Sequence, residues 1–252
     1  MIEMKKDNLI IKKYDTRAEM GRMAAKDAEV VIADIIAKKG EINMIFAAAP
    51  SQNEMLENLL ASDIIDWSKV NALHMDEYIG LCKGDSRTFG VYLYEHIFGK
   101  KNFKSVNYIR GFEADSEAEC ERYTRLLEEF KVDVVCLGIG ENGHIAFNDP
   151  WVAEFNDSKM VKVVELDAKC RQQQVNDGCF PTIDDVPTHA ISLTIPALTS
   201  ADYMFCVVPA ATKADAVKNT VCGEISEDCP ATIMRRHKNA ILYCDADSGK
   251  YL

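Results

Sequence analysis

Residues 134–150 decide the fold, and they read Val134-Val135-Cys136-Leu137-Gly138-Ile139-Gly140-Glu141-Asn142-Gly143-His144-Ile145-Ala146-Phe147-Asn148-Asp149-Pro150. The stretch begins with a continuous apolar run that contains β-branched residues, which is typical of a strand buried on both faces of a parallel sheet. Three glycines then follow within six residues. Glycine tolerates positive φ and allows a ligand to approach the backbone closely. The pattern therefore predicts a buried strand that ends in a ligand-binding loop.

This loop contains one histidine, His144, with Asn142 and Asp149 close to it in the sequence. An imidazole beside an amide and a carboxylate, at the end of a buried strand, is suited to general acid–base chemistry. The alternative is a structural histidine in a glycine-rich turn, and the loop alone leaves both interpretations open. The glycines also match G-x-G-x-x-G, but no helix with an acidic residue about 20 positions further on is evident, so we set a dinucleotide site aside.

The composition predicts one soluble domain that covers residues 1–252. A chain of this length with 48% hydrophobic residues can build a single α/β core. No apolar run approaches the ~20 residues that span a bilayer, and the N-terminus lacks the apolar centre of a signal peptide. Nine cysteines without a C-x-x-C pair favour reduced thiols in a cytoplasmic protein. The net charge of −11 argues against nucleic acid or an anionic membrane as a partner.

Helix-like and strand-like patterns alternate along the chain. Thr16 to Glu19 form a capping box that opens a helix ending at Gly40, and Ser116 to Glu119 form a second one before a helix to about 130. Further helices are expected over 54–61 and 86–98 and near 212–213, and strands over 42–48, 70–75, from 132, and over 160–165, 190–193, 203–208 and 240–244. The alternation predicts an open, mostly parallel, Rossmann-like sheet with helices on both faces. The more polar stretch at about 150–188 is expected to form a lid-like excursion.

Four polar residues lie just past predicted strands: Ser51, Asp76, His144 and Lys213. Ligands of open parallel sheets bind at the carboxyl ends of the strands, so we expect these side chains to meet in one cleft. Taken singly, Asp76 also fits a helix N-cap and Lys213 a solvated helix lysine. A metal site that combines His74 with Asp76 and His144 is disfavoured, because no compact ligand spacing supports it.

Two long motifs carry a family resemblance. Residues 73–81 contain Met75-Asp76-Glu77-Tyr78-Ile79-Gly80-Leu81, and residues 138–150 contain the histidine loop. Together they resemble M-D-E-Y-x-G-L and G-x-G-x-[DN]-G-H-I-A-F-N-[ED]-P of the glucosamine-6-phosphate deaminase/isomerase family, which is related to the 6-phosphogluconolactonases. Thr212-Lys213-Ala214 and residues 233–245 extend the likeness over nearly the whole chain.

The resemblance implies that the partner is a small sugar phosphate. The implied reaction converts a 2-amino-2-deoxy-hexose 6-phosphate, with the gluco or galacto epimer left open, to a ketose 6-phosphate and ammonia, without a metal or organic cofactor. It assigns proton transfer between C2 and C1 to Asp76 and ring opening to His144, which Asp149 and Asn142 would orient. The implied substrate and phosphate contacts are Ser51, Gln52, Asn53, Gly140, Gly143, Arg171 and Lys213.

The sequence departs from the family at the expected phosphate contacts. Residues 49–55 lack the family's P-T-G-G-T/S-P pattern, although Ser51 and the amides of Gln52 and Asn53 remain available, and Glu54 is unfavourable beside a phosphate. Segment 167–180 lacks the family's usual clamping arginine, which leaves Arg171 as the substitute.

Near the histidine, Asn142 and Asp149 stand where aspartate and glutamate are usual, and we expect the Asn142 amide to accept a hydrogen bond from the imidazole. Lactone hydrolysis and a non-enzymatic sugar-phosphate sensor remain the alternative functions. Assembly into a homo-oligomer stays open.

Overall fold

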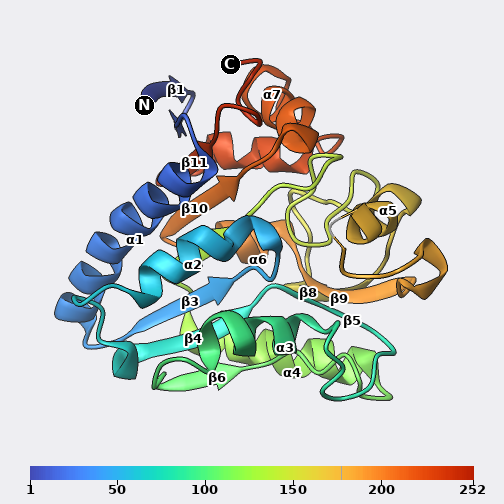
Figure 1. Cartoon of the computed structure of the whole chain (residues 1–252). Helices are drawn as coiled ribbons and strands as arrows, with labels where there is room; N and C mark the ends of the chain where they lie inside the picture. Colours follow the sequence, from blue (N-terminus) through green and yellow to red (C-terminus); the bar gives the residue numbers. More distant parts are fainter. Residues whose placement is uncertain (177) are drawn as a thin grey trace.

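A computed structural model describes residues 1–176 and 178–252, and its centre is an eight-stranded sheet (Figure 1). The strand order is β1-β2-β11-β10-β7-β3-β4-β6. The strands are β1 (Ile2–Lys6), β2 (Leu9–Lys13), β3 (Ile42–Phe46), β4 (Val70–His74), β6 (Ser105–Asn107), β7 (Val134–Leu137), β10 (Tyr203–Val208) and β11 (Ala240–Cys244). Every neighbouring pair is parallel except β1 and β2, so the predicted open, mostly parallel sheet is confirmed.

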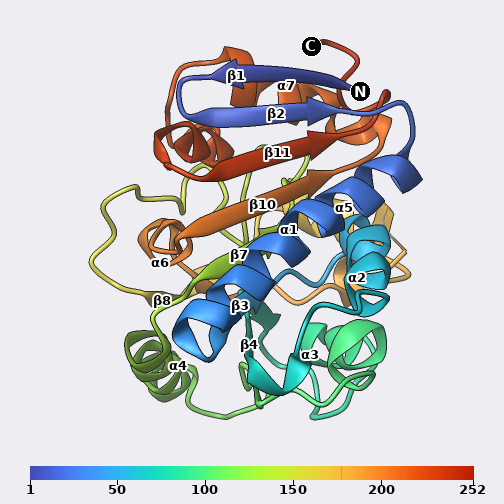
Figure 2. The same cartoon turned by 90° about the vertical axis from the view of Figure 1, so that its left-hand side faces the viewer.

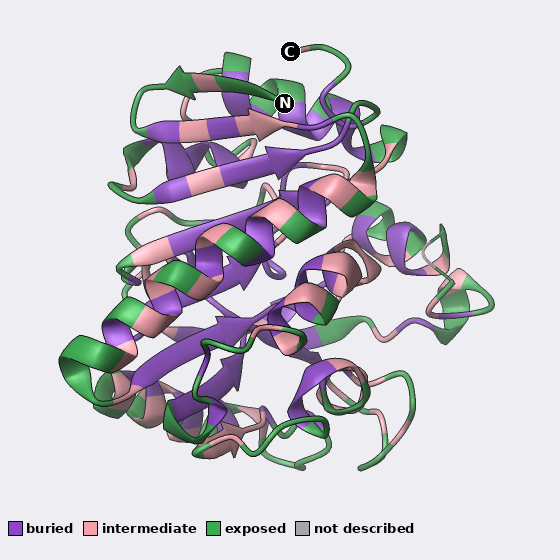
Figure 3. Cartoon of the chain, turned by 60° about the vertical axis from the view of Figure 1, so that its left-hand side comes forward, coloured by how far each residue is buried: buried purple, intermediate pink, exposed green. Residues whose placement is uncertain are grey.

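Helices cover both faces of this sheet, as predicted. One face carries α1 (Arg17–Lys39), α2 (Asn53–Leu60) and α3 (Phe89–Leu93), and α1 crosses it obliquely in Figure 2. The other face carries α4 (Ser116–Phe130), α6 (Ile195–Thr199) and α7 (Ala214–Cys222). Figure 3 shows buried strands between helices whose outer surfaces are exposed. No helix among the described residues has the length and hydropathy needed to cross a membrane.

Capping explains where the two longest helices begin. The side chain of Thr16 accepts a hydrogen bond from the Glu19 amide at 3.1 Å, and α1 ends at Gly40 with φ of 82°. The second predicted capping box is wrong. Asp115 caps α4 instead, and Glu119 binds the Arg110 amide (2.7 Å) from the preceding loop.

A second, antiparallel sheet joins β5 (Asp76–Tyr78), β9 (His189–Leu193) and β8 (Val161–Glu165). The sequence predicted β8 and β9 as strands, but they do not join the parallel sheet. The chain between them, within the segment expected as a lid-like excursion, contains α5 (Ala168–Asn176) and the short turn Ile183–Asp185. Because β5 follows β4 directly, this small sheet holds Asp76 at the carboxyl edge of the large one.

The N-terminal hairpin β1–β2 was not predicted. Only Leu9 and Ile11 are buried in these lysine-rich strands, so they lack a strong apolar pattern. The helix expected over 86–98 begins later, at Phe89, where the Thr88 side chain caps it, and it continues as a π-helical turn over Tyr94–Phe98.

Buried polar groups hold the junction of β4 and β5. The Tyr123 hydroxyl on α4 accepts a hydrogen bond from the His74 amide (2.9 Å) and lies 3.0 Å from the His74 carbonyl oxygen. The Ile109 amide donates to His74 Nε2 (2.8 Å), so Nδ1 carries the proton and donates to the Asp76 carbonyl oxygen (2.9 Å). Burial lowers the pKa of His74 to about 4, which keeps the ring neutral. His74 therefore supports the backbone of Asp76.

We expect Tyr123→Phe to lower the free energy of unfolding by about 1–3 kcal/mol, because it leaves buried backbone groups of His74 without their partner. Urea unfolding measures this loss. Tyr94→Phe, at an exposed tyrosine, is the matched control and should leave stability nearly unchanged. Equal stability of the two variants would contradict the role given to Tyr123.

Candidate active site

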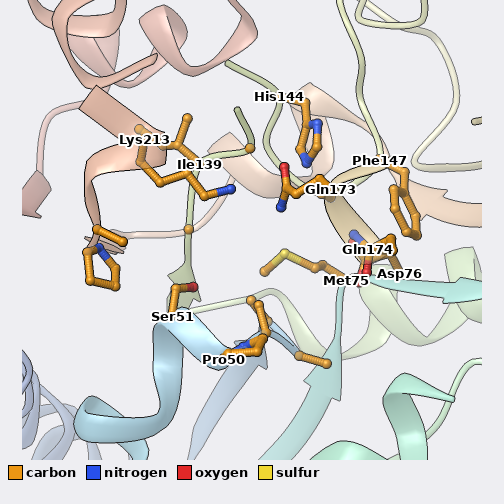
Figure 4. Close-up of a pocket in the computed structure, with 18 of the residues that line it drawn as sticks. Pro50, Ser51, Met75, Asp76, Ile139, His144, Phe147, Gln173, Gln174 and Lys213 are labelled. Carbon is orange, nitrogen blue, oxygen red and sulfur yellow. The ribbon is translucent and has the colours of Figure 1, made fainter. Parts of the chain in front are cut away.

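The topology creates a crevice between β3 and β7. These strands are neighbours, yet the chain leaves β3 toward β4 on one side and leaves β7 toward β10 on the other. Such a switch point is the usual ligand site of an open α/β sheet. A pocket of about 130 Å³ lies at this edge, lined by the loops after β3, β4, β7 and β10 and by α5 (Figure 4).

Five of the predicted site residues line this pocket together: Ser51, Asp76, Gly140, His144 and Lys213. Asn142 and Asp149 lie behind the imidazole and hold it. The other four predicted residues, Gln52, Asn53, Gly143 and Arg171, are not part of the described lining. The pocket thus combines a hydroxyl, a carboxyl, an imidazole and an ammonium group, as the strand ends suggested.

The imidazole is oriented by a buried carboxylate. His144 Nδ1 lies 2.9 Å from Asp149 Oδ1, and the Asn142 amide donates to the same oxygen at 2.7 Å. Burial acts to raise the pKa of Asp149, but the hydrogen bonds from His144 and Asn142 outweigh it and lower the pKa. An ionised Asp149 keeps the proton on Nδ1 and leaves Nε2 to exchange protons with a ligand.

Asn142 acts differently from the expectation. Its Nδ2 donates to Asp149, and its Oδ1 accepts from the backbone amide of His144 (3.1 Å) rather than from the ring. The side chain therefore braces the loop and the carboxylate.

The glycines of the loop make room for neighbouring groups. A Cβ atom at Gly140 would lie 2.2 Å from His144 Cε1, so only glycine lets the ring occupy its place. Gly143 has φ of +89°, and a Cβ atom there would lie 2.7 Å from Cys229 Sγ. Gly140 therefore leaves room for the imidazole at the pocket, whereas Gly143 allows the positive φ of the turn and the close contact with Cys229.

Asp76 lies on the other side of the pocket, at the start of β5 (Figure 4). Its pKa is raised well above the ordinary value, first by burial and then by the neighbouring charge of Glu77. A carboxyl group with a raised pKa that faces a pocket is suited to accept and return a proton.

Glu77 points away from the pocket and has a structural role. Its carboxylate accepts hydrogen bonds from the amides of Tyr78 (2.9 Å), Phe89 (3.0 Å) and Gly90 (2.9 Å), and so holds the start of α3. Burial raises its pKa to about 7, although these three donors act in the opposite direction.

The loop after β3 differs from the predicted anion cradle. The Gln52 amide donates to the Ala49 carbonyl oxygen at 2.9 Å, and the Asn53 amide donates to that of Pro50. The Gln52 side chain binds the carbonyl oxygens of Leu137 (3.1 Å) and Val207 (3.3 Å). Gln52 thereby ties together the ends of β7 and β10, and Ser51 is the member of this loop's predicted trio that reaches the pocket.

The two predicted cations behave differently. Lys213 is buried at the pocket, in the turn Ala211–Lys213 before α7. The preceding Ala210 has a φ of 81°, and its amide donates to Asp245 Oδ2 at 3.1 Å. Arg171 instead donates to the carbonyl oxygens of Ile183 (2.5 Å) and Val186 (3.0 Å), so it fastens α5 to the turn that follows.

Among the pocket residues that the sequence reasoning missed are three with long polar side chains: Arg17, Gln173 and Gln174. Gln173 Oε1 accepts a hydrogen bond from the Glu141 amide (3.0 Å), and Gln174 lies near Asp76 in Figure 4. The only sequence signal for the glutamines was the run 172–174 inside the excursion, and Arg17 was read solely as part of a helix cap.

One group of three described residues has the composition of a metal site. Ligand atoms of His144, Asp149 and Cys170 all lie within 4.8 Å of one another. Burial raises the pKa of the Cys170 thiol well above its ordinary value, so it stays protonated, and Asp149 is already hydrogen-bonded to His144. These contacts fit a hydrogen-bonded pair packed against a thiol better than a metal centre.

Comparison with known proteins agrees with these features. Residues 15–243 match the family model of glucosamine-6-phosphate isomerases/6-phosphogluconolactonase. The chain is 35% identical over 213 residues to a glucosamine-6-phosphate deaminase of Listeria monocytogenes serotype 4a (strain HCC23), covering 84% of this chain and 89% of the relative. It is 39% identical over 184 residues to that of Bacillus cereus (strain G9842), covering 73% and 68%.

Solved structures show the same fold. A monomeric glucosamine-6-phosphate deaminase, described as a missing link of the NagB superfamily, is similar with a TM-score of 0.86 and 27% identity, over 96% of this chain and 99% of that one. A 6-phosphogluconolactonase from Shewanella baltica OS155 has a TM-score of 0.77 at 15% identity, over 94% of this chain and 97% of that one, which supports the fold alone.

Glu77 gives the stability of this site a pH dependence. Its pKa rises from 4.5 to about 7 on folding, so between these pH values the folded state holds a proton that the unfolded state has released. The Glu77 contribution to the free energy of unfolding should therefore fall by about 3 kcal/mol as pH rises from 4.5 to 7. Glu77→Gln should make the pH dependence measured by urea unfolding less steep by this amount, and Glu57→Gln, at an exposed glutamate, should leave it unchanged. Identical pH profiles for wild type and Glu77→Gln would refute the assignment.

Proposed function

This chain belongs to the glucosamine-6-phosphate isomerase/6-phosphogluconolactonase family, and from that premise we propose that it is an amino-sugar-phosphate deaminase. The substrate is a 2-amino-2-deoxy-hexose 6-phosphate of the gluco or galacto series, and the products are a ketose 6-phosphate and ammonia. The observation that carries the proposal is that the Asp76 carboxyl and the His144 imidazole, which Asp149 holds from behind, line one pocket.

The first step opens the sugar ring. His144 Nε2, in its protonated form, donates a proton to the ring oxygen, the bond between C1 and that oxygen breaks, and the C1 hydroxyl gives its proton to water as the aldehyde forms. Asp149 holds Nδ1 at 2.9 Å and stabilises the imidazolium that donates the proton.

The second step moves a proton between neighbouring carbons. Asp76 takes the proton from C2 of the open-chain aldehyde, the ammonium group gives one proton to the C1 oxygen, and Asp76 returns its proton to C1. These transfers leave a hydroxymethyl group at C1 and an iminium at C2. Water then adds to C2, and ammonia leaves. A buried carboxyl with a raised pKa suits both halves of this transfer, because it binds the proton between them without releasing it to solvent.

Lactone hydrolysis needs fewer catalytic side chains than deamination does. Attack of a water activated by a histidine–carboxylate pair would involve His144 and Asp149 and give Asp76 no proton to return to carbon. The Asp76 carboxyl on the pocket wall therefore favours the isomerase reading over the hydrolase, and the two reactions have different products.

We expect purified protein to release ammonia from glucosamine-6-phosphate or galactosamine-6-phosphate. Asp76→Asn should lower kcat by about 10²–10⁴, because it removes the group that transfers the proton. Coupled measurement of ammonia and ketose phosphate checks both products. Turnover of 6-phosphogluconolactone with no ammonia from either amino sugar would overturn the proposal in favour of the hydrolase.

Gly140→Ala should lower the reaction rate by displacing the His144 ring. The added methyl group would lie 2.2 Å from the ring and displace it, and a displacement on the order of 1 Å costs about 10² in rate. In a His144→Gln background the same change should have almost no further effect, because the group that it displaces is already absent. Additive losses in the double variant would show that Gly140 acts on something other than the imidazole.

A further inference from the structure

The pocket contains an arginine that comes from a different part of the chain than segment 167–180. Arg17, the first residue of α1, lines the pocket together with Pro50, Ser51 and Lys213. We propose that Arg17 binds the anionic end of the substrate and selects phosphorylated sugars. This inference rests on the proposed function for the identity of the substrate, and it names a recognition residue that the family motifs do not indicate.

Close packing of α1 against α2 brings Arg17 to the pocket. One turn further along α1, a Cβ atom at Gly21 would lie 2.4 Å from the Cβ of Glu54, so only glycine permits this approach. Arg17 lies on the same side of the helix, four residues earlier. Its Nε donates to Glu54 Oε1 at 2.6 Å, and its Nη2 donates to the Pro50 carbonyl oxygen. The guanidinium thus joins the turn that begins at Pro50 to the first turn of α2.

The guanidinium keeps donors for a ligand. Its five N–H groups form a rigid fork that matches carboxylate and phosphate oxygens. Nε and Nη2 are bonded as above, whereas Nη1 makes no hydrogen bond to any residue that the structure describes. The side chain is 37% exposed, so a ligand can reach it. An anion beside Ser51 would therefore meet a hydroxyl, an ammonium group and one edge of a guanidinium.

Arg17 also removes an electrostatic obstacle. Glu54 at the start of α2 would repel a phosphate, but the ion pair with Arg17 offsets its charge. Arg171 on α5 does not take this role in the observed arrangement, because it is not part of the described pocket lining and its Nε and Nη2 bind backbone oxygens of Ile183 and Val186. The arginine at the pocket is thus supplied by α1.

The location predicts an effect on binding more than on proton transfer. Arg17 donates a hydrogen bond to Pro50 and lines the pocket together with Ser51. Both of these residues lie across the pocket from His144 in Figure 4. Loss of Arg17 should raise KM for a phosphorylated amino sugar and change kcat little. KM for the corresponding non-phosphorylated sugar should stay unchanged, because it has no anion to bind.

The test uses inorganic phosphate as the probe, with calorimetry on the full chain. Arg17→Gln should weaken phosphate binding by about ten- to a hundredfold, the range for a lost charge-assisted hydrogen bond. Arg22→Gln, at an exposed arginine of the same helix, should bind phosphate as the wild type does. Arg17→Lys keeps the charge without the fork and should be intermediate, and it replaces Arg17→Gln if that variant does not fold.

A double variant distinguishes direct contact between Arg17 and the anion from an indirect effect in which Arg17 only offsets the charge of Glu54. If Arg17 touches the anion, Arg17→Gln combined with Glu54→Gln should still bind phosphate weakly. Recovery of wild-type affinity in the double variant would overturn the inference, because Arg17 would then only offset Glu54. Wild-type affinity in Arg17→Gln, or no phosphate binding by the wild type, would overturn it as well. Arg17-dependent phosphate binding without ammonia release would refute the proposed function and leave this inference standing.

Discussion

Strand β9 is the constraint on which the two halves of the site depend. Its residue Ser192 pairs with Asp76, and the Leu193 amide donates to the Met75 carbonyl oxygen at 2.8 Å. The same strand also holds the histidine loop, because the Asn148 side chain donates to the Leu193 carbonyl oxygen (2.8 Å) and Ser192 Oγ accepts from the Phe147 amide (3.1 Å). One short strand thus fixes the carboxyl group relative to the imidazole. Shifting its register by one residue would move both attachments at once.

Local patterns were sufficient for much of the fold. Strands β10 and β11 have the predicted bounds, and α1 begins and ends at its predicted caps, because these elements are specified by apolar runs, Thr16 and Gly40. Pairing was harder to predict. Nothing near residues 161–165 indicates that their partner is an antiparallel strand beyond α5, since sheet membership depends on contacts far apart in the chain. The cap of α4 was misplaced for a local reason: Asp115, one residue before Ser116, accepts from the Ala118 amide, and aspartate and serine are both favoured at N-caps.

The site residues also divide into those that the sequence predicts and those that depend on tertiary packing. Ser51, Asp76, His144 and Lys213 were predictable because each follows a strand, and parallel strands end at one edge. Side-chain direction was not predictable, so Gln52 was expected at the anion and is found clamping two strand ends. Arg17 and the glutamines of α5 were missed because helices bring them to the pocket, and helix placement follows from tertiary packing such as that of Gly21 on Glu54.

The backbone at Ala210 links the site to the end of the chain. With φ of 81° and ψ of 148° this alanine occupies a region that usually belongs to glycine, at a cost of about 1–3 kcal/mol. The acceptor for its amide is Asp245, which in turn accepts from the Ser248 amide at 2.8 Å. Residues 245–248 therefore restrain the turn that carries Lys213 by hydrogen bonds, although they do not line the pocket themselves. The segment thus supports the pocket from outside its lining. A fusion or truncation that loosens residues 245–248 would release the turn that carries Lys213 and impair the pocket, although the lining residues themselves were unchanged.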